Sequence, residues 1–124
     1  MENFSEKLKK RTKAFALDII KICQGIPYSA VNSVLIKQLT RSATSVAANY
    51  RAASRARSDA EFYAKICIVV EEADETLFWI EMLMESGIVD QSRIDRYYNE
   101  AEEILKIMSS IKNKTKPKLQ KYKP

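Results

Sequence analysis

The chain has 124 residues, of which 46% are apolar and 30% charged, and its formal net charge is +5. This length is that of one domain that buries its own core, and two Gly and three Pro are too few for a β-sandwich. No apolar run reaches the roughly 18–20 residues of a membrane span, and the N-terminal segment lacks the apolar core of a signal peptide. We therefore expect a cytoplasmic, all-α protein without membrane association.

Two amphipathic helices are predicted in the first half of the chain. The first covers residues 6–24 and ends at Gly25 and Pro27, which are typical helix-terminating residues. The second covers residues 32–56. Its high content of Ala, Ser and Thr allows neighbouring backbones to pack closely.

Two more helices follow. Ser58 and Glu61 form a capping box at the start of the third helix, which Gly87 closes, and Asp90 precedes the fourth. Because the connections are short, successive helices are expected to be antiparallel. The sequence thus predicts an up-down-up-down four-helix bundle over residues 1–111.

The C-terminal segment 112–124 is expected to be a disordered, lysine-rich tail, since it has almost nothing to bury. Its lysines have two interpretations, a solubilising end or a salt-sensitive contact with a polyanion. The candidate contacts are Lys112, Lys114, Lys116 and Lys118.

Charge is segregated along the sequence. Residues 1–57 carry eleven Lys/Arg and three Asp/Glu, residues 58–103 carry three and thirteen, and residues 104–124 carry seven and none. An acidic third helix can therefore neutralise a basic second helix, within one chain or between subunits.

The second helix carries a basic stripe on the side opposite its apolar face. Within about 40° of one direction lie Lys37, Arg41, Arg51 and Arg55. Small residues form the floor of the stripe, namely Thr44, Ser45 and Ala48. This flat cationic face is one that a phosphate chain could approach closely.

Three interpretations of the basic stripe remain open. It can be a solvated face, it can pair with acids of the third helix, or it can contact nucleic-acid phosphates. The acids in question are Glu71, Glu72, Asp74 and Glu75, which are interpreted as a solvated face or as ion-pair partners of Arg51 and Arg55.

The third helix has more apolar surface than one core requires. A second apolar face consists of Ile68, Phe78, Trp79 and Met82. A helix that is apolar on two faces is central in a larger bundle or buried in an oligomer interface, and we favour a homo-oligomer.

No catalytic centre is expected. Histidine is absent, which removes the usual catalytic dyads and half of the ligands of a di-metal bundle site. Cys23 and Cys67 are expected to be free thiols, with a disulfide left open. We expect no enzyme activity, no metal and no cofactor.

The run from Gln38 to Leu83 resembles the four-helix-bundle proteins often encoded in intervening sequences of bacterial large-subunit ribosomal RNA genes. The pattern is an Arg followed by small residues, an Asn, basic residues, a Glu-Phe pair and an acidic stretch. The matching positions are Arg41, Ser42, Ser45, Asn49, Arg51, Arg55, Glu61, Phe62, Glu72 and Glu75.

This resemblance implies a homo-oligomer, and in particular a pentamer. It also extends to accessory proteins of diversity-generating retroelements, which bind nucleic acid and a reverse transcriptase. We expect a protein that binds RNA or DNA with little sequence preference. The alternative is a scaffold that docks an acidic protein partner such as a retroelement reverse transcriptase.

Overall fold

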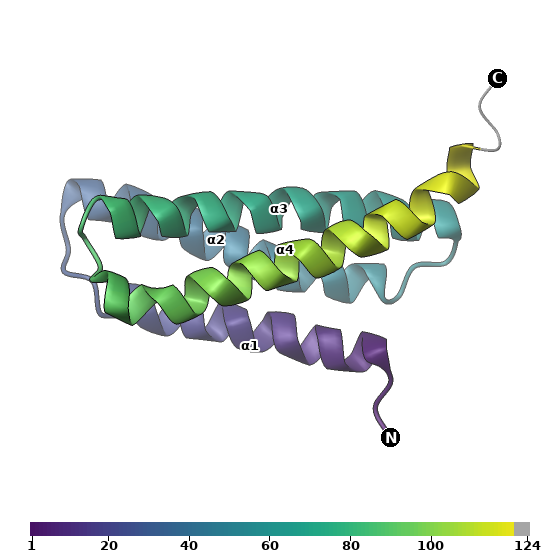
Figure 1. Ribbon diagram of the computed structural model, residues 1–124, viewed down its shortest axis with the longest axis horizontal. Coiled ribbons are helices and arrows are strands. Elements are labelled where there is room, and N and C mark those ends of the chain that lie inside the picture. Colours follow the sequence, from purple (N-terminus) through teal and green to yellow (C-terminus); the bar gives the residue numbers. More distant parts are fainter. Residues whose placement is uncertain (121–124) are drawn as a thin grey trace.

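A computed structural model describes residues 1–120, which form four helices and no strand. They are α1 (Phe4–Gln24), α2 (Ala30–Ala53), α3 (Asp59–Glu85) and α4 (Gln91–Gln120). Each helix runs antiparallel to the one before it, so the predicted up-down-up-down bundle is confirmed (Figure 1). No helix in this part of the chain is both long and apolar enough to cross a membrane.

Local signals in the sequence set the helix ends. Asn3, Ser29 and Ser58 are N-caps whose side-chain oxygens each accept a hydrogen bond from the backbone N–H three residues further on. The predicted cap at Ser58 is confirmed, since its Oγ lies 3.1 Å from the Glu61 nitrogen. Beyond α3 the chain turns at Gly87, whose φ of 79° is a conformation that favours glycine.

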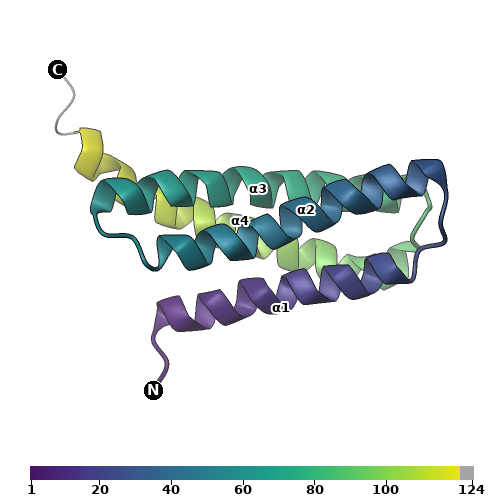
Figure 2. The ribbon, with the colours of Figure 1, turned by 180° about the vertical axis from the view of Figure 1, so that it is seen from behind.

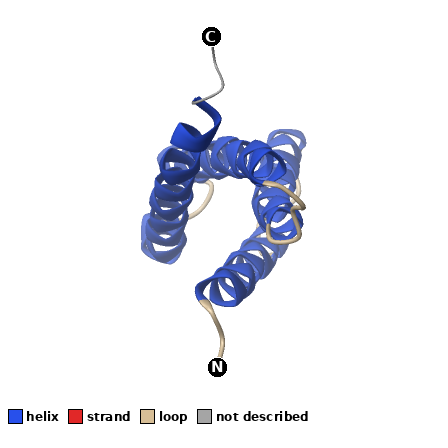
Figure 3. Ribbon diagram, turned by 90° about the vertical axis from the view of Figure 1, so that its right-hand side faces the viewer, coloured by secondary structure: helices blue, strands red, loops and turns tan. Residues whose placement is uncertain are grey.

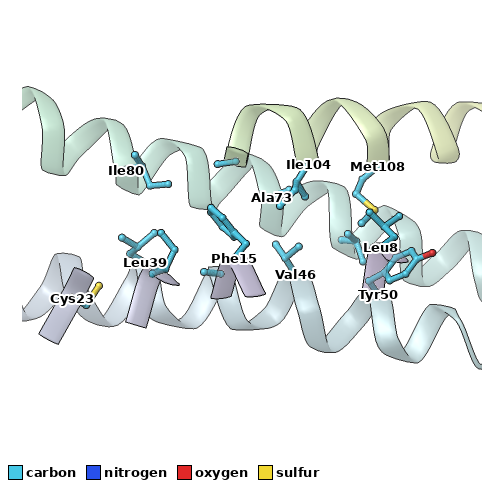
Figure 4. Close-up of a cluster of buried hydrophobic side chains, with 14 of the residues drawn as sticks. Leu8, Phe15, Cys23, Leu39, Val46, Tyr50, Ala73, Ile80, Ile104 and Met108 are labelled. Atoms are coloured by element: carbon cyan, nitrogen blue, oxygen red, sulfur yellow. The ribbon is translucent and has the colours of Figure 1, made fainter. Parts of the chain in front are cut away.

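The core extends along the bundle and draws apolar side chains from all four helices (Figure 4). Small buried residues lie where α2 packs against α3, namely Ala43 on α2 and Ala73 on α3. The buried hydroxyls of Ser42 and Thr76 lie 2.9 Å apart in a hydrogen bond across this contact. The Ala, Ser and Thr content of α2 therefore allows the close packing that the sequence predicted.

Viewed end-on, the helices form an arc in the order α1, α2, α3, α4, and α1 and α4 make the sparsest contact (Figure 3). The start of α1, the α2–α3 connection and the end of α4 lie at one end of the bundle (Figures 1 and 2). Basic segments that are far apart in the sequence thus gather at this end.

The expected start of the disordered tail at Lys112 is corrected, because α4 continues to Gln120. Up to Lys116, each residue added to the nucleated helix gains a hydrogen bond at low cost, and lysine is a good helix former. The Thr115 hydroxyl also bonds back to the Ile111 carbonyl at 3.1 Å. The last four residues of the predicted tail, 121–124, lie outside the described residues.

Leu39 tests the position of the core. Its side chain is 0% exposed, so Leu39→Ala should lower the free energy of unfolding by about 2–5 kcal/mol. Val31, on the same helix, is 67% exposed, and Val31→Ala should change it by less than about 0.5 kcal/mol. Urea unfolding followed by circular dichroism measures both, and equal losses would contradict the burial of Leu39.

Candidate functional site

The four basic residues predicted as one stripe have different surroundings in the structure. Lys37, Arg41 and Arg51 are exposed on α2, as expected. Arg55 is also exposed, but α2 ends at Ala53, three residues earlier than predicted, and Arg55 lies in the turn that follows. The turn is held by backbone bonds, including the one from the Arg55 N–H to the Ala52 carbonyl (3.1 Å).

Arg41 pairs with two carboxylates of α3. Its Nη1 lies 2.8 Å from Glu72 Oε2 and its Nη2 lies 2.6 Å from Glu75 Oε2. Hydrogen bonding to Arg41 is the main cause that lowers the pKa of Glu75, and the two carboxylates raise the pKa of Arg41. Pairing with acids of the third helix, one of the three interpretations, therefore describes Arg41. The alternative in which these acids pair with Arg51 and Arg55 is not seen within residues 1–120 of one chain.

One of the carboxylates that pair with Arg41 also contacts a residue of the second apolar face of α3. Trp79 donates its indole N–H to Glu75 Oε1 at 3.2 Å, and its ring meets Phe78 edge-on with centroids 4.9 Å apart. Of the four residues predicted at an oligomer interface, Phe78 is 48% and Ile68 38% exposed, whereas Trp79 and Met82 are half-buried. Arg41 thus helps to hold an aromatic pair at the edge of this exposed face.

A groove lies between α1 and the end of α2, two helices that are labelled in Figure 2, and it has a volume of about 490 Å³. Its lining residues are Glu6, Lys9, Lys10 and Lys13 from α1, and Thr44, Ala47, Ala48, Arg51 and Arg55 from α2 and the following turn. Cations therefore come from both helices, and the floor between them consists of small side chains. We call this feature the cationic groove.

The cations of the groove are only partly neutralised. Lys9 pairs with Glu6 at 3.0 Å, and Lys10 pairs with Glu2, which raises the pKa of Lys10. In contrast, Lys13, Arg51 and Arg55 have no ion-pair partner within residues 1–120. Three unpaired cations thus flank one concave surface, an arrangement that attracts an anion with several charges.

Sequence reasoning missed the α1 side of this groove. Lys9, Lys10 and Lys13 recur at helical spacing beside the buried face of α1, so a second basic stripe was present in the sequence. What the sequence does not show is that this stripe borders the end of α2. Arg51 and Arg55 were predicted as binding residues, and the structure brings them together with these lysines.

The remaining predicted contacts lie elsewhere. Lys37 is fourteen residues from Arg51, about 21 Å along the helix, and is not part of the groove. On α4, Lys112 is half-buried and Lys114 and Lys116 are exposed, while Lys118 lies outside the residues whose side chains are described. The cysteines are free, with Cys23 buried and Cys67 half-buried, and burial raises the pKa of the Cys23 thiol.

A second arginine joins α1 to α4. Arg11 makes a two-pronged contact with Glu100, at 2.8 Å from Nε and 2.7 Å from Nη2, and also pairs with Glu103 at 3.0 Å. These carboxylates raise the pKa of Arg11. Arg11 is therefore neutralised on the side of α1 that faces α4, whereas the groove lysines lie on the side that faces α2.

The fold and these charges define an all-α four-helix-bundle protein with a cationic groove between its first two helices. The chain belongs to the 23S rRNA-intervening sequence protein family, whose model matches residues 6–110. The family resemblance found in the sequence is thereby confirmed.

One similar solved structure is the crystal structure of a protein with unknown function from the S23 ribosomal protein family of Bacteroides thetaiotaomicron VPI-5482. It is 31% identical, with a TM-score of 0.80, and the match covers 88% of this chain and 97% of that one. Among curated proteins, none matches this chain.

The Arg41 pair has a testable pH dependence. Arg41→Gln should lower the free energy of unfolding by about 0.5–1 kcal/mol at neutral pH, since exposed ion pairs contribute little. Because Arg41 lowers the pKa of Glu75, this contribution is complete above the ordinary pKa of 4.5 and is lost as the pH falls through the lowered value. Urea unfolding should show the difference from wild type shrinking as the pH is lowered below 4.5.

Arg51→Gln is the matched control, since Arg51 is exposed on the same helix and unpaired within residues 1–120. It should change the free energy of unfolding by less than about 0.5 kcal/mol both at neutral pH and below pH 4.5. An effect of Arg41→Gln that stays constant as the pH is lowered from neutral to below 4.5 would contradict the role of the carboxylates.

Proposed function

We propose that this protein is a cytoplasmic, non-enzymatic homo-oligomer that binds RNA or another nucleic acid with little sequence preference. The observation that carries the proposal is the cationic groove, where Lys13, Arg51 and Arg55 have no acidic partner within residues 1–120. Lys and Arg contact phosphates irrespective of base, which explains the low sequence preference. RNA is the ligand that we would test first.

A salt series tests nucleic-acid binding. Fluorescence anisotropy of a labelled RNA should show an affinity that decreases linearly on a log–log plot against salt, because binding releases counterions from the phosphates. A variant with Gln at the α4 lysines should retain affinity within about threefold if the folded bundle supplies the site. The lysines replaced are Lys112, Lys114, Lys116 and Lys118.

One result would move the binding site, and another would contradict nucleic-acid binding. Loss of binding in the Gln variant would assign the contact to the end of α4 instead of the groove. Absence of binding by the wild-type chain even at about 50 mM salt would exclude nucleic acid. In that case the alternative gains support, namely an acidic protein partner such as a retroelement reverse transcriptase, whose carboxylates the same cations could bind. Capture of such a partner would survive nuclease treatment.

We also propose self-association, as a pentamer, through the exposed apolar face of α3. Its support is the partial exposure of Ile68 and Phe78 on a helix that also supplies a buried core face. Exposed aromatic side chains are enriched at protein–protein interfaces.

Charge introduced on this face should dissociate the assembly. Ile68→Glu with Phe78→Glu should reduce the mass measured by sedimentation equilibrium to that of the 14.2 kDa chain, because an interface would have to bury two carboxylates. Leu17→Glu is the control, since Leu17 is 49% exposed on α1. Wild-type sedimentation at the monomer mass would contradict self-association, and an unchanged mass in the double variant would contradict this interface.

A further inference from the structure

We infer that the cationic groove holds the sugar–phosphate backbone of one nucleic-acid strand, with about three phosphates between α1 and α2 and the bases directed outward. The inference rests on the proposed function and specifies its ligand as single-stranded. It also assigns Lys13, from a helix that the sequence did not implicate, to the same site as Arg51 and Arg55.

The shape of the groove favours one strand. Ala47 and Ala48 contribute only methyl groups to the floor and Thr44 only a short hydroxyl side chain, so a ligand backbone can approach α2 closely. The concave space of about 490 Å³ is bounded by helices on two sides. A single strand can enter such a space and meet cations on both sides at once. A duplex carries its phosphates on the outside of a wide, rigid helix and would meet only one side at a time.

The lining residues also indicate whether the groove can bind the bases of the strand. None of the side chains that line the groove is aromatic, so it offers no surface on which bases could stack. Single-strand binding that relies on stacking gains about 1–3 kcal/mol per base, and this groove lacks that contribution. Affinity should therefore come from phosphate contacts and vary little with base sequence.

Electrostatics sets the number of phosphates. Lys13 on one side and Arg51 and Arg55 on the other are unpaired within residues 1–120, whereas Lys9 and Lys10 already have acidic partners. Three neutralised phosphates predict a slope of about −2 in log affinity against log salt, at about −0.7 per phosphate for single strands. Between 50 and 200 mM salt this is a fall of about 20-fold.

The test compares two double variants of the full chain with equal changes in net charge. Lys13→Gln with Arg55→Gln removes two groove cations and should reduce the magnitude of the slope by about 1.4 and the affinity for single-stranded RNA at least tenfold at about 100 mM salt. Lys21→Gln with Arg93→Gln removes two exposed cations outside the groove and should change affinity less than about twofold. Circular dichroism confirms that each variant is folded.

The second arm varies the ligand with wild-type protein. Single-stranded RNA should bind more tightly than a duplex of the same length, and single strands of different base composition should bind alike. Tripolyphosphate at the same total phosphate concentration should compete less well than an unlabelled strand. If it competes equally, the groove is a site for small polyanions and the inference is wrong.

The outcomes separate this inference from the proposed function. Wild-type binding that is unchanged in the groove variant, or that favours duplex, would overturn the inference and leave nucleic-acid binding standing. Absence of wild-type binding to either RNA at about 50 mM salt would overturn both.

Discussion

The packing of two basic helices side by side is the constraint on which the surface chemistry of this protein depends. α1 and α2 bring lysines and arginines to one shared groove, whereas on its other side each of them meets glutamates of a neighbouring helix. There, Arg41 pairs with two carboxylates of α3 and Arg11 with two of α4. Opposite charges are thus neutralised where α2 meets α3 and where α1 meets α4, and unpaired cations remain where α1 meets α2.

The repulsion between the unpaired cations of α1 and α2 is small compared with the free energy gained by burying apolar side chains between these helices. Exposed charge pairs interact by about 0.2–1 kcal/mol, whereas one fully buried large apolar side chain contributes about 1.5–3 kcal/mol. α1 and α2 together bury a continuous set of such side chains, including Phe15, Ile19, Leu39 and Val46. Burial therefore decides how the helices pack, and the unneutralised charge of the groove is left to be balanced by ions or by a ligand.

The sequence predicted the fold because its signals are local. The 3.6-residue apolar period and the cap at Ser58 do not depend on which helices become neighbours. The cationic groove depends on which helices pack side by side, so its residues were predicted only in part. Arg41 and Arg51 lie on the same helix, yet α3 offers carboxylates to one while α1 offers lysines near the other. The prediction of a disordered tail from Lys112 likewise did not consider how readily an established helix such as α4 extends.

The basic and apolar surfaces occupy different parts of the arc, and this separation links the proposals. The groove lies between α1 and α2, whereas the exposed apolar face belongs to α3, so the two surfaces draw on different helices (Figure 3). A groove that holds about three phosphates binds weakly at physiological salt. Several grooves on one assembly, engaged by one long strand, would raise the overall affinity through effective concentration without any new contact. Self-association would then be the step that makes a weak backbone site effective.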